Sequence, residues 1–150
     1  MRIALGADHA GVALKREVAR LLDERGLSYT DFGTSSTESV DYPDFAVSVG
    51  REVAAGAYDR GILFCGSGIG MAIAANKIPG VRAAVALDET SARLSREHND
   101  ANVLSLGERL TAPDLARRIV ETFLDTPFAG GRHQRRVDKI NALDGSPEFP

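Results

Sequence analysis

The sequence has little of what proteins use to bind metals, membranes or nucleic acids. Cys65 is its single cysteine and only three histidines accompany it, so we expect no intrachain disulfide and a poor structural zinc site. The 18 lysines and arginines are outnumbered by 21 acidic residues, which leaves no basic excess for a nucleic-acid backbone or an anionic membrane. The longest uncharged run, residues 61–76, is broken by glycines and is too short to span a bilayer. We therefore expect neither nucleic acid nor membrane among the partners.

The sequence also lacks tryptophan and the features of a secretion signal. A flavin-binding electron carrier is disfavoured, because a flavin site offers aromatic stacking partners. The first residues lead directly into an apolar segment, without the basic and long apolar zones of a signal peptide. With 150 residues, of which 43% are hydrophobic and 26% charged, the chain fits one globular domain. We expect this single domain over residues 1–143, a flexible tail over residues 144–150 and a cytoplasmic location.

Short apolar segments alternate along the chain with segments of helical spacing. The expected strands cover residues 2–7, 27–32, 61–65, 81–87 and 103–106. The expected helices cover residues 11–25, 44–55, 71–76, 89–99, 111–124 and 133–143, with Asp88 and Thr111 as N-caps of the fourth and fifth. Strands and helices that alternate through short connections form a parallel sheet with helices on both faces. The predicted fold class is α/β, a Rossmann-like three-layer α/β/α domain with a five-stranded parallel sheet.

In open parallel sheets, ligands bind beyond the carboxyl ends of the strands. Asp8 and His9 follow the first expected strand, where a carboxylate can exchange protons and an imidazole can bind an anion. Taken alone, however, these two residues fit a helix cap and a surface histidine better.

A glycine-rich loop follows the third expected strand: Cys65, Gly66, Ser67, Gly68, Ile69 and Gly70. Glycines allow successive backbone N–H groups to point into one concavity, and the helix that follows adds its positive end. Such a loop stabilises a phosphate or an oxyanion, and a cysteine at its rim can act as base or nucleophile. The alternative is a buried cysteine beside a tight turn. We favour the functional interpretation, because packing does not explain so many glycines.

Three familiar interpretations of this loop fail. The spacing is G-x-G-x-G, so it does not match the dinucleotide fingerprint G-x-G-x-x-G. The Gly-Lys-Ser/Thr ending of a P-loop is missing. A cysteine phosphatase would place an arginine where this chain has Met71. What remains is an oxyanion-binding loop beside a thiol.

Two polar clusters lie further along the chain. His98 and Asn99 stand at the end of the fourth expected helix. Taken alone, they fit an ordinary helix terminus better, with Asn99 in a left-handed turn. Arg132 and Arg136 are four positions apart and share a face if their segment is helical, which suits the binding of one phosphate. A solvated basic turn explains these arginines equally well.

Taken together, the motifs resemble one family of small sugar-phosphate isomerases. The matching segments are residues 6–11 (GADHAG), 41–43 (DYP), 65–70 (CGSGIG), 74–77 (AANK), 98–102 (HNDAN) and 130–133 (GGRH). Their order and spacing resemble ribose-5-phosphate isomerase B over residues 1–143, a family that also includes allose-6-phosphate and galactose-6-phosphate isomerases. The resemblance implies an aldose–ketose isomerase of the pentose phosphate pathway that needs no metal or organic cofactor.

The resemblance also implies roles for individual residues. Cys65 would move a proton between C1 and C2 of the open-chain sugar through an enediolate, which the backbone of residues 66–70 would stabilise. Ser67, often threonine in the family, would relay protons between the oxygens. His98, assisted by Asp8, would open the furanose ring, and Asn99 would hold sugar hydroxyls. The phosphate would be bound by His9, Arg132 and Arg136.

Helix geometry predicts an oligomer. Ten residues separate Asp88 from His98, or about 15 Å of helix, which carries His98 away from Cys65 of its own chain. If both serve one site, His98 and Asn99 come from a neighbouring subunit, in a homodimer or a tetramer with shared sites. Two alternatives to a ribose 5-phosphate isomerase stay open: an isomerase of a six-carbon sugar phosphate such as allose 6-phosphate, and a non-catalytic phosphosugar-binding module.

Overall fold

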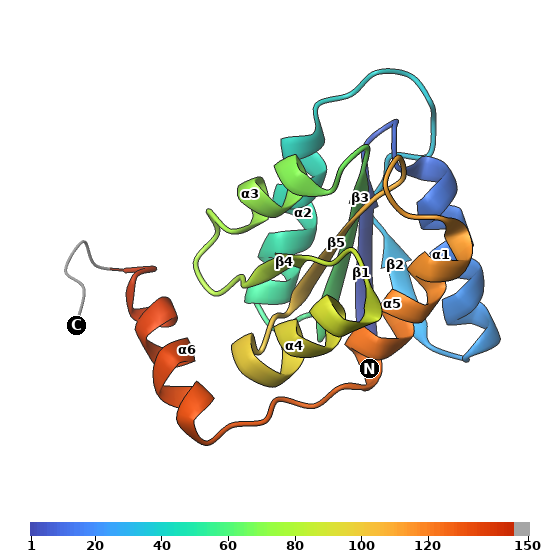
Figure 1. Cartoon of the computed structure of the whole chain (residues 1–150). Helices are drawn as coiled ribbons and strands as arrows, with labels where there is room; N and C mark the ends of the chain where they lie inside the picture. The colour runs from blue at the N-terminus through green and yellow to red at the C-terminus, as the bar shows by residue number, and fades with distance from the viewer. Residues whose placement is uncertain (146–150) are drawn as a thin grey trace.

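The computed structural model describes residues 1–145, which form a five-stranded parallel sheet and its helices (Figure 1). The strands lie in the order β2-β1-β3-β5-β4. Their bounds are β1 Arg2–Ala7, β2 Ser28–Asp31, β3 Arg60–Cys65, β4 Ala83–Val85 and β5 Val103–Gly107. The helices are α1 Val12–Glu24, α2 Tyr42–Ala54, α3 Ile69–Ala75, α4 Glu89–Asn99, α5 Pro113–Asp125 and α6 Arg132–Ala142.

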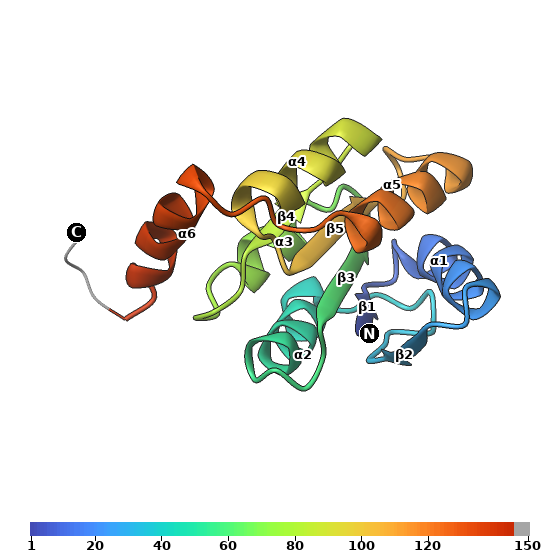
Figure 2. The ribbon, with the colours of Figure 1, turned by 90° about the horizontal axis from the view of Figure 1, so that it is seen from below.

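The helices make two layers, one on each face of the sheet. Helices α1, α4 and α5 cover one face, and α2 and α3 cover the other (Figures 1 and 2). Helix α6 belongs to neither layer: it extends beyond the β4 side of the sheet and packs against α4. The predicted three-layer α/β/α fold with five parallel strands is confirmed.

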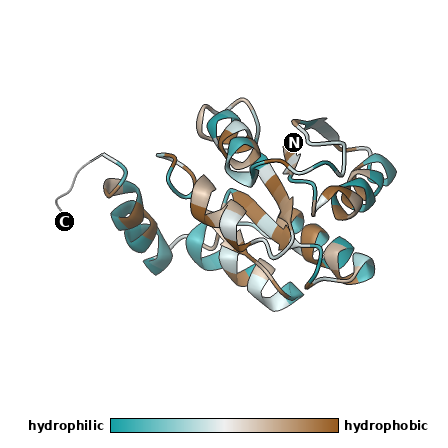
Figure 3. Cartoon of the chain, turned by 90° about the horizontal axis from the view of Figure 1, so that it is seen from above, coloured by the Kyte–Doolittle hydropathy of each residue, from teal (hydrophilic) through white to brown (hydrophobic). Residues whose placement is uncertain are grey.

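The central strands are apolar on both sides, as expected for strands covered by two helical layers. Side chains alternate between the two cores: Ile3 and Leu5 pack with α1 and α5, whereas Ala4 between them packs with α2. In Figure 3 the strands are mainly hydrophobic and the outer helix surfaces are mainly hydrophilic. The sheet therefore contributes side chains to both cores, and this packing fixes the positions of its strand ends.

Several expected boundaries differ from the structure. Strand β4 spans three residues rather than residues 81–87, because it lies at the sheet edge and pairs with β5 only over this length. Helix α2 begins at Tyr42 and so includes Pro43, which the first turn of a helix accepts without losing a hydrogen bond. Thr111 does not cap α5: Ala112 holds the N-cap position, and the buried Thr111 hydroxyl has no hydrogen-bond partner within residues 1–145.

The capping role of Asp88 is confirmed. Its Oδ1 accepts a hydrogen bond of 2.6 Å from the Ser91 N–H. In return, Ser91 Oγ accepts a hydrogen bond from the Asp88 backbone N–H, which completes a capping box. Backbone hydrogen bonding to this carboxylate lowers the pKa of Asp88. Helix α4 therefore begins at the residue that the sequence predicts.

The C-terminal end is described up to residue 145. Asp144 accepts a hydrogen bond of 2.7 Å from the Gly80 N–H, so the first part of the predicted tail contacts the α3–β4 connection. The rest of that prediction, residues 146–150, lies outside the described residues. None of the helices within residues 1–145 combines the length and the apolar character needed to cross a membrane.

Candidate active site

A cavity of about 550 Å³ opens at the carboxyl ends of β1 and β3. The residues that line it come from the end of β3, from the connections after β1, β3 and β5, and from helices α2 and α3, which are distant in sequence. Its lining residues are Asp8, His9, Ala10, Tyr42, Cys65, Gly66, Ser67, Ile69, Gly70, Ile73 and Arg109. The strand-end rule thus places the predicted Asp8–His9 pair and the predicted cysteine loop in one cavity.

Cys65 is the last residue of β3 and lines the cavity, although only 5% of its surface is exposed. The Gly68 N–H points back and donates a hydrogen bond of 3.0 Å to Cys65 Sγ. The sulfur therefore sits against the loop backbone, with one amide donor directed at it.

The glycine loop is fixed by contacts on both sides. Gly68 has φ +79°, which favours glycine, and its carbonyl accepts a 2.6 Å hydrogen bond from the buried Ser105 hydroxyl on β5. Within the loop, the Ile69 N–H donates to Ser67 Oγ at 3.2 Å. The N–H groups of Gly66 and Ser67 have no acceptor among residues 1–145. These two amides stand beside the thiol, where they can bind an oxyanion.

Asp8 and His9 hold their positions through local backbone contacts. Asp8 Oδ1 accepts a 2.9 Å hydrogen bond from the Ala10 N–H, and Asp8 is 6% exposed. It is not a helix cap, since Gly11 holds that position of α1. His9 Nδ1 accepts a 3.2 Å hydrogen bond from the Val40 N–H. The neutral ring therefore carries its proton on Nε2, which can donate to an anion.

Arg109 is a candidate that the sequence reasoning missed. It follows β5, its N–H donates to the Gly66 carbonyl at 3.0 Å, and its guanidinium lies over Gly66. Its Nη1 stands 3.1 Å from where a Cβ on Gly66 would be. None of the ion pairs found among the described residues involves this guanidinium, so its charge is available to an anion in the cavity. The strand-end rule, extended to the fifth strand, would have found it.

The second group of predicted site residues lies elsewhere in the chain. His98 and Asn99 end α4, which runs to the opposite edge of the sheet from Cys65 (Figure 1). The strand register shows the separation. Cys65 pairs with Gly107 at the end of β5, whereas α4 ends just before the start of β5. The length of β5 is on the order of 13 Å. The positive φ after α4 falls on Asp100 rather than on Asn99.

Arg132 and Arg136 are on α6, also away from the cavity. They share one helix, which begins at Arg132, one residue before the predicted start at residue 133. His133 from the same turn stacks on His98, with ring centroids 4.3 Å apart and an interplanar angle of 14°. Burial, then the nearby charges of His98, Arg132 and Arg136, lower the pKa of His133. The predicted residues thus form two groups, one around Cys65 and one around the His98–His133 stack.

Comparison with known proteins identifies the family. The family model described as Ribose/Galactose Isomerase matches residues 3–140. The chain belongs to this family. Ribose-5-phosphate isomerase B of Escherichia coli (strain K12) is 49% identical over 143 residues, covering 95% of this chain and 96% of that protein.

Solved structures of ribose-5-phosphate isomerase B have the same fold as this chain. Clostridium thermocellum ribose-5-phosphate isomerase B matches with a TM-score of 0.95 at 55% identity, over 96% of this chain and 97% of that one. The Mycoplasma genitalium ribose-5-phosphate isomerase B, solved with bound ribulose-5-phosphate, matches with a TM-score of 0.92 at 41% identity, over 95% of each chain. The family resemblance drawn from the motifs is therefore confirmed.

Proposed function

We propose that the chain is an aldose–ketose isomerase that interconverts ribose 5-phosphate and ribulose 5-phosphate. The observation that carries the proposal is a thiol that lines a cavity beside unpaired loop amides, in a member of the ribose/galactose isomerase family. Abstraction of a proton next to a carbonyl creates an oxyanion, and this site pairs a base with donors for that anion.

Proton transfer is assigned to the loop. The Cys65 thiolate removes the proton from C2 of the open-chain aldose, and the electron pair moves to give an enediolate. The thiol then returns a proton to C1, which yields the ketose, while Ser67 relays a proton between O1 and O2. The amides of Gly66 and Ser67 bind the developing negative charge, and each such donor is worth about 3 kcal/mol of transition-state stabilisation.

Anion binding in the cavity is assigned to His9 and Arg109. The His9 Nε2 donor and the Arg109 guanidinium lie on residues that line the same cavity as Cys65. A bound phosphate remote from the reacting carbons supplies binding energy that orients the reactive end of the sugar. Reduced Cys65 is required for this chemistry, so we place the reaction in the reducing cytoplasm.

We further propose that two chains form each site. His98, assisted by Asp8 of the neighbouring chain, opens the furanose ring, Asn99 holds sugar hydroxyls, and Arg132 and Arg136 bind phosphate. The separation of these residues from Cys65 within one chain supports sharing in a homodimer. Apolar side chains stand exposed near both groups and are available for an interface: Ile69, Ile73, Ile140 and Leu143.

The first test measures exchange of hydrogen with solvent. In deuterium oxide, the wild-type chain is expected to incorporate deuterium at C1 or C2 of ribose 5-phosphate. Cys65→Ala should reduce exchange and turnover by about 10²- to 10⁴-fold while the sugar phosphate still binds, because the base is lost and the cavity remains. Near-normal turnover of Cys65→Ala would remove the thiol from the mechanism. Parallel assays with allose 6-phosphate show whether a six-carbon substrate reacts faster.

The second test addresses the shared site. Cys65→Ala and His98→Ala should each be inactive, and mixing them should restore activity, because one site of each hybrid dimer then has both native groups. Subunit exchange is verified by mass spectrometry of the intact complex. Exchange without recovery would show that His98 and Cys65 do not meet across subunits.

A further inference from the structure

Helix α6 is attached to the rest of the chain mainly by polar contacts. It lies outside both helical layers, and its main helix neighbour is α4 (Figures 1 and 2). Its buried residues are His133, which stacks on His98, and Val137. One stacked pair and one valine provide little apolar burial, so the orientation of α6 depends on what holds its C-terminal half. The hydrogen bond between the Gly80 N–H and Asp144 holds the chain just after α6.

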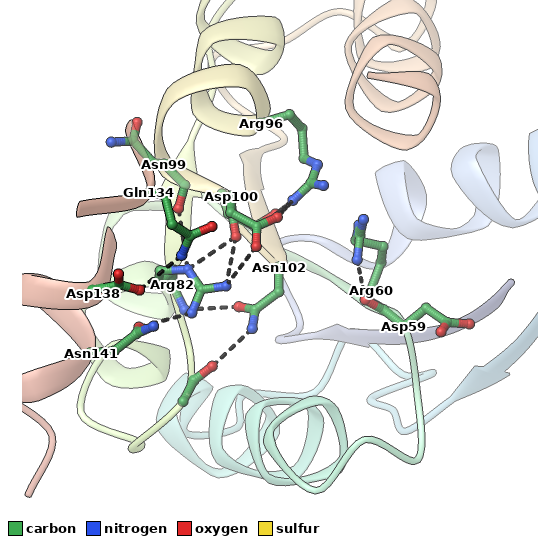
Figure 4. A network of polar contacts seen from close by, with 12 residues as sticks. Asp59, Arg60, Arg82, Arg96, Asn99, Asp100, Asn102, Gln134, Asp138 and Asn141 are labelled. Carbon is green, nitrogen blue, oxygen red and sulfur yellow. Dashed lines mark hydrogen bonds and ion pairs between the residues drawn. The ribbon is translucent and has the colours of Figure 1, made fainter. Parts of the chain in front are cut away.

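Arg82, between α3 and β4, contacts α6 itself (Figure 4). Its Nη1 donates a hydrogen bond of 3.0 Å to Asn141 Oδ1 on α6. Its Nε donates to the carbonyls of Asn99 and Asp100, at 3.2 and 3.0 Å, and its Nη2 donates to the Asp100 carbonyl at 2.9 Å. One guanidinium therefore joins the turn after α4 to α6.

The turn that Arg82 holds directly follows His98 and Asn99, the last two residues of α4. Asp100 in this turn has φ +46°, an uncommon conformation for a residue other than glycine. Its carboxylate pairs with Arg96, 2.7 Å away and 3% exposed, and with Arg82 at 3.4 Å. The turn is thus fixed on one side by α4 itself and on the other side by Arg82.

We propose that Arg82 is a positioning residue, which fixes the orientation of α6 relative to the end of α4, where His98 and Asn99 lie. The inference rests on the proposed shared site: the end of α4 carries His98 and Asn99, α6 carries Arg132 and Arg136, and all four act together in the cavity of the neighbouring chain. Arginine suits this task because its planar guanidinium donates in several fixed directions, which the single ammonium of lysine does not. Arg82 itself lies among acceptors of its own chain and does not line the Cys65 cavity.

The main test asks whether Arg82 acts for the neighbouring site. Arg82→Met keeps most of the side-chain volume, and Asp100 stays paired with Arg96, so the chain is expected to fold. We expect kcat/KM for ribose 5-phosphate to fall about tenfold or more, through lost orientation of the turn and α6. Mixing with Cys65→Ala should raise activity to about a quarter of wild type, because each hybrid then has one site with native parts.

Each result of the mixing test decides the proposal. A defect that mixing fails to repair, while the Cys65→Ala and His98→Ala pair is repaired, would show that Arg82 acts in its own chain. An Arg82→Met activity within about twofold of wild type would also overturn the proposal. Failure of both pairs would instead reject the shared site, so the two hypotheses fail in distinguishable ways.

A milder pair of variants tests the contact with α6 separately. Asn141→Leu removes the acceptor on α6 but leaves the bonds of Arg82 to the turn. We expect it to raise KM about fivefold with little change in kcat, because the arginines of α6 bind the unreactive phosphate. Asn141→Asp keeps an acceptor and should restore KM.

Arg93→Met, at an exposed α4 position, is the matched control for Arg82→Met, and its kcat/KM should stay within twofold of wild type. Equal KM values for Asn141→Leu and wild type would overturn the role of the contact between Arg82 and Asn141.

Discussion

Backbone amides hold two of the side chains that line the cavity. The Cys65 sulfur accepts from the Gly68 amide, and His9 accepts from the Val40 amide, so each group presents one defined face to the cavity. Arg109 differs because none of the ion pairs found in the described part of the chain involves its guanidinium. Such an unpaired cation near a thiol provides the charge complementarity that an anionic substrate requires.

His133 gives a prediction at this scale. Its pKa lies below the usual value of 6.5, so between these two values the unfolded chain binds more protons at this residue than the folded chain. The free energy of unfolding should therefore decrease as the pH falls through this window. His133→Phe keeps a ring against His98 without titrating, and should show a weaker decrease. Urea unfolding of both chains between about pH 5 and pH 8 measures this, and equal slopes would contradict it.

The sequence predicts those site residues that directly follow a strand. Asp8, His9 and Cys65 were found because parallel strands end at one edge of the sheet, and the structure places all three in one cavity. Arg109 is not predicted, because it is the second residue after its strand and belongs to no recognisable motif. The unpaired Thr111 hydroxyl could not have been foreseen, since satisfaction of a hydroxyl depends on tertiary neighbours.

Among the elements, helix α4 and strand β4 show what local sequence determines. The bounds of α4 were predicted correctly because Asp88 and Ser91 form a capping box, which is encoded within four residues. Strand β4 was predicted too long, because its extent is set by pairing with β5 and not by its own apolar residues. The position of α6 beyond the β4 side was not predictable, as it depends on contacts with α4 and Arg82.

Ser105 gives a prediction for the contact between β5 and the glycine loop. Ser105→Ala removes the buried hydrogen bond to the Gly68 carbonyl and should lower the free energy of unfolding by about 1 kcal/mol. Because the loop amides then lose their fixed orientation, kcat should also fall, by up to about 100-fold.

The control for Ser105 is Thr126→Val, which removes a hydroxyl bond of the same length at the end of α5. It should cost similar stability and leave kcat unchanged. Unfolding and steady-state kinetics on both variants separate the two effects. Equal kcat in Ser105→Ala and wild type would show that the loop holds its shape without β5.

For the molecule as a whole, the exposed apolar face of α3 gives a prediction. Ile73 is 59% exposed and Ile69 is 54% exposed, and both lie beside the cavity. If this face is covered by a second chain, Ile73→Asp should convert the oligomer to monomers, because a charge would be buried at the interface. Ile73→Met keeps the apolar contact and should stay oligomeric. Sedimentation velocity distinguishes the two, and an oligomeric Ile73→Asp chain would exclude α3 from the interface.

The location of Cys65 and His98 at opposite ends of the sheet has a genetic consequence when the sites are shared. Two alleles, one defective near Cys65 and the other near His98, would together restore the activity in a single cell, although neither supplies it alone. Two alleles defective at the same end would not. The pattern of complementation among random mutations would therefore divide this gene into two groups that follow the two ends of the sheet.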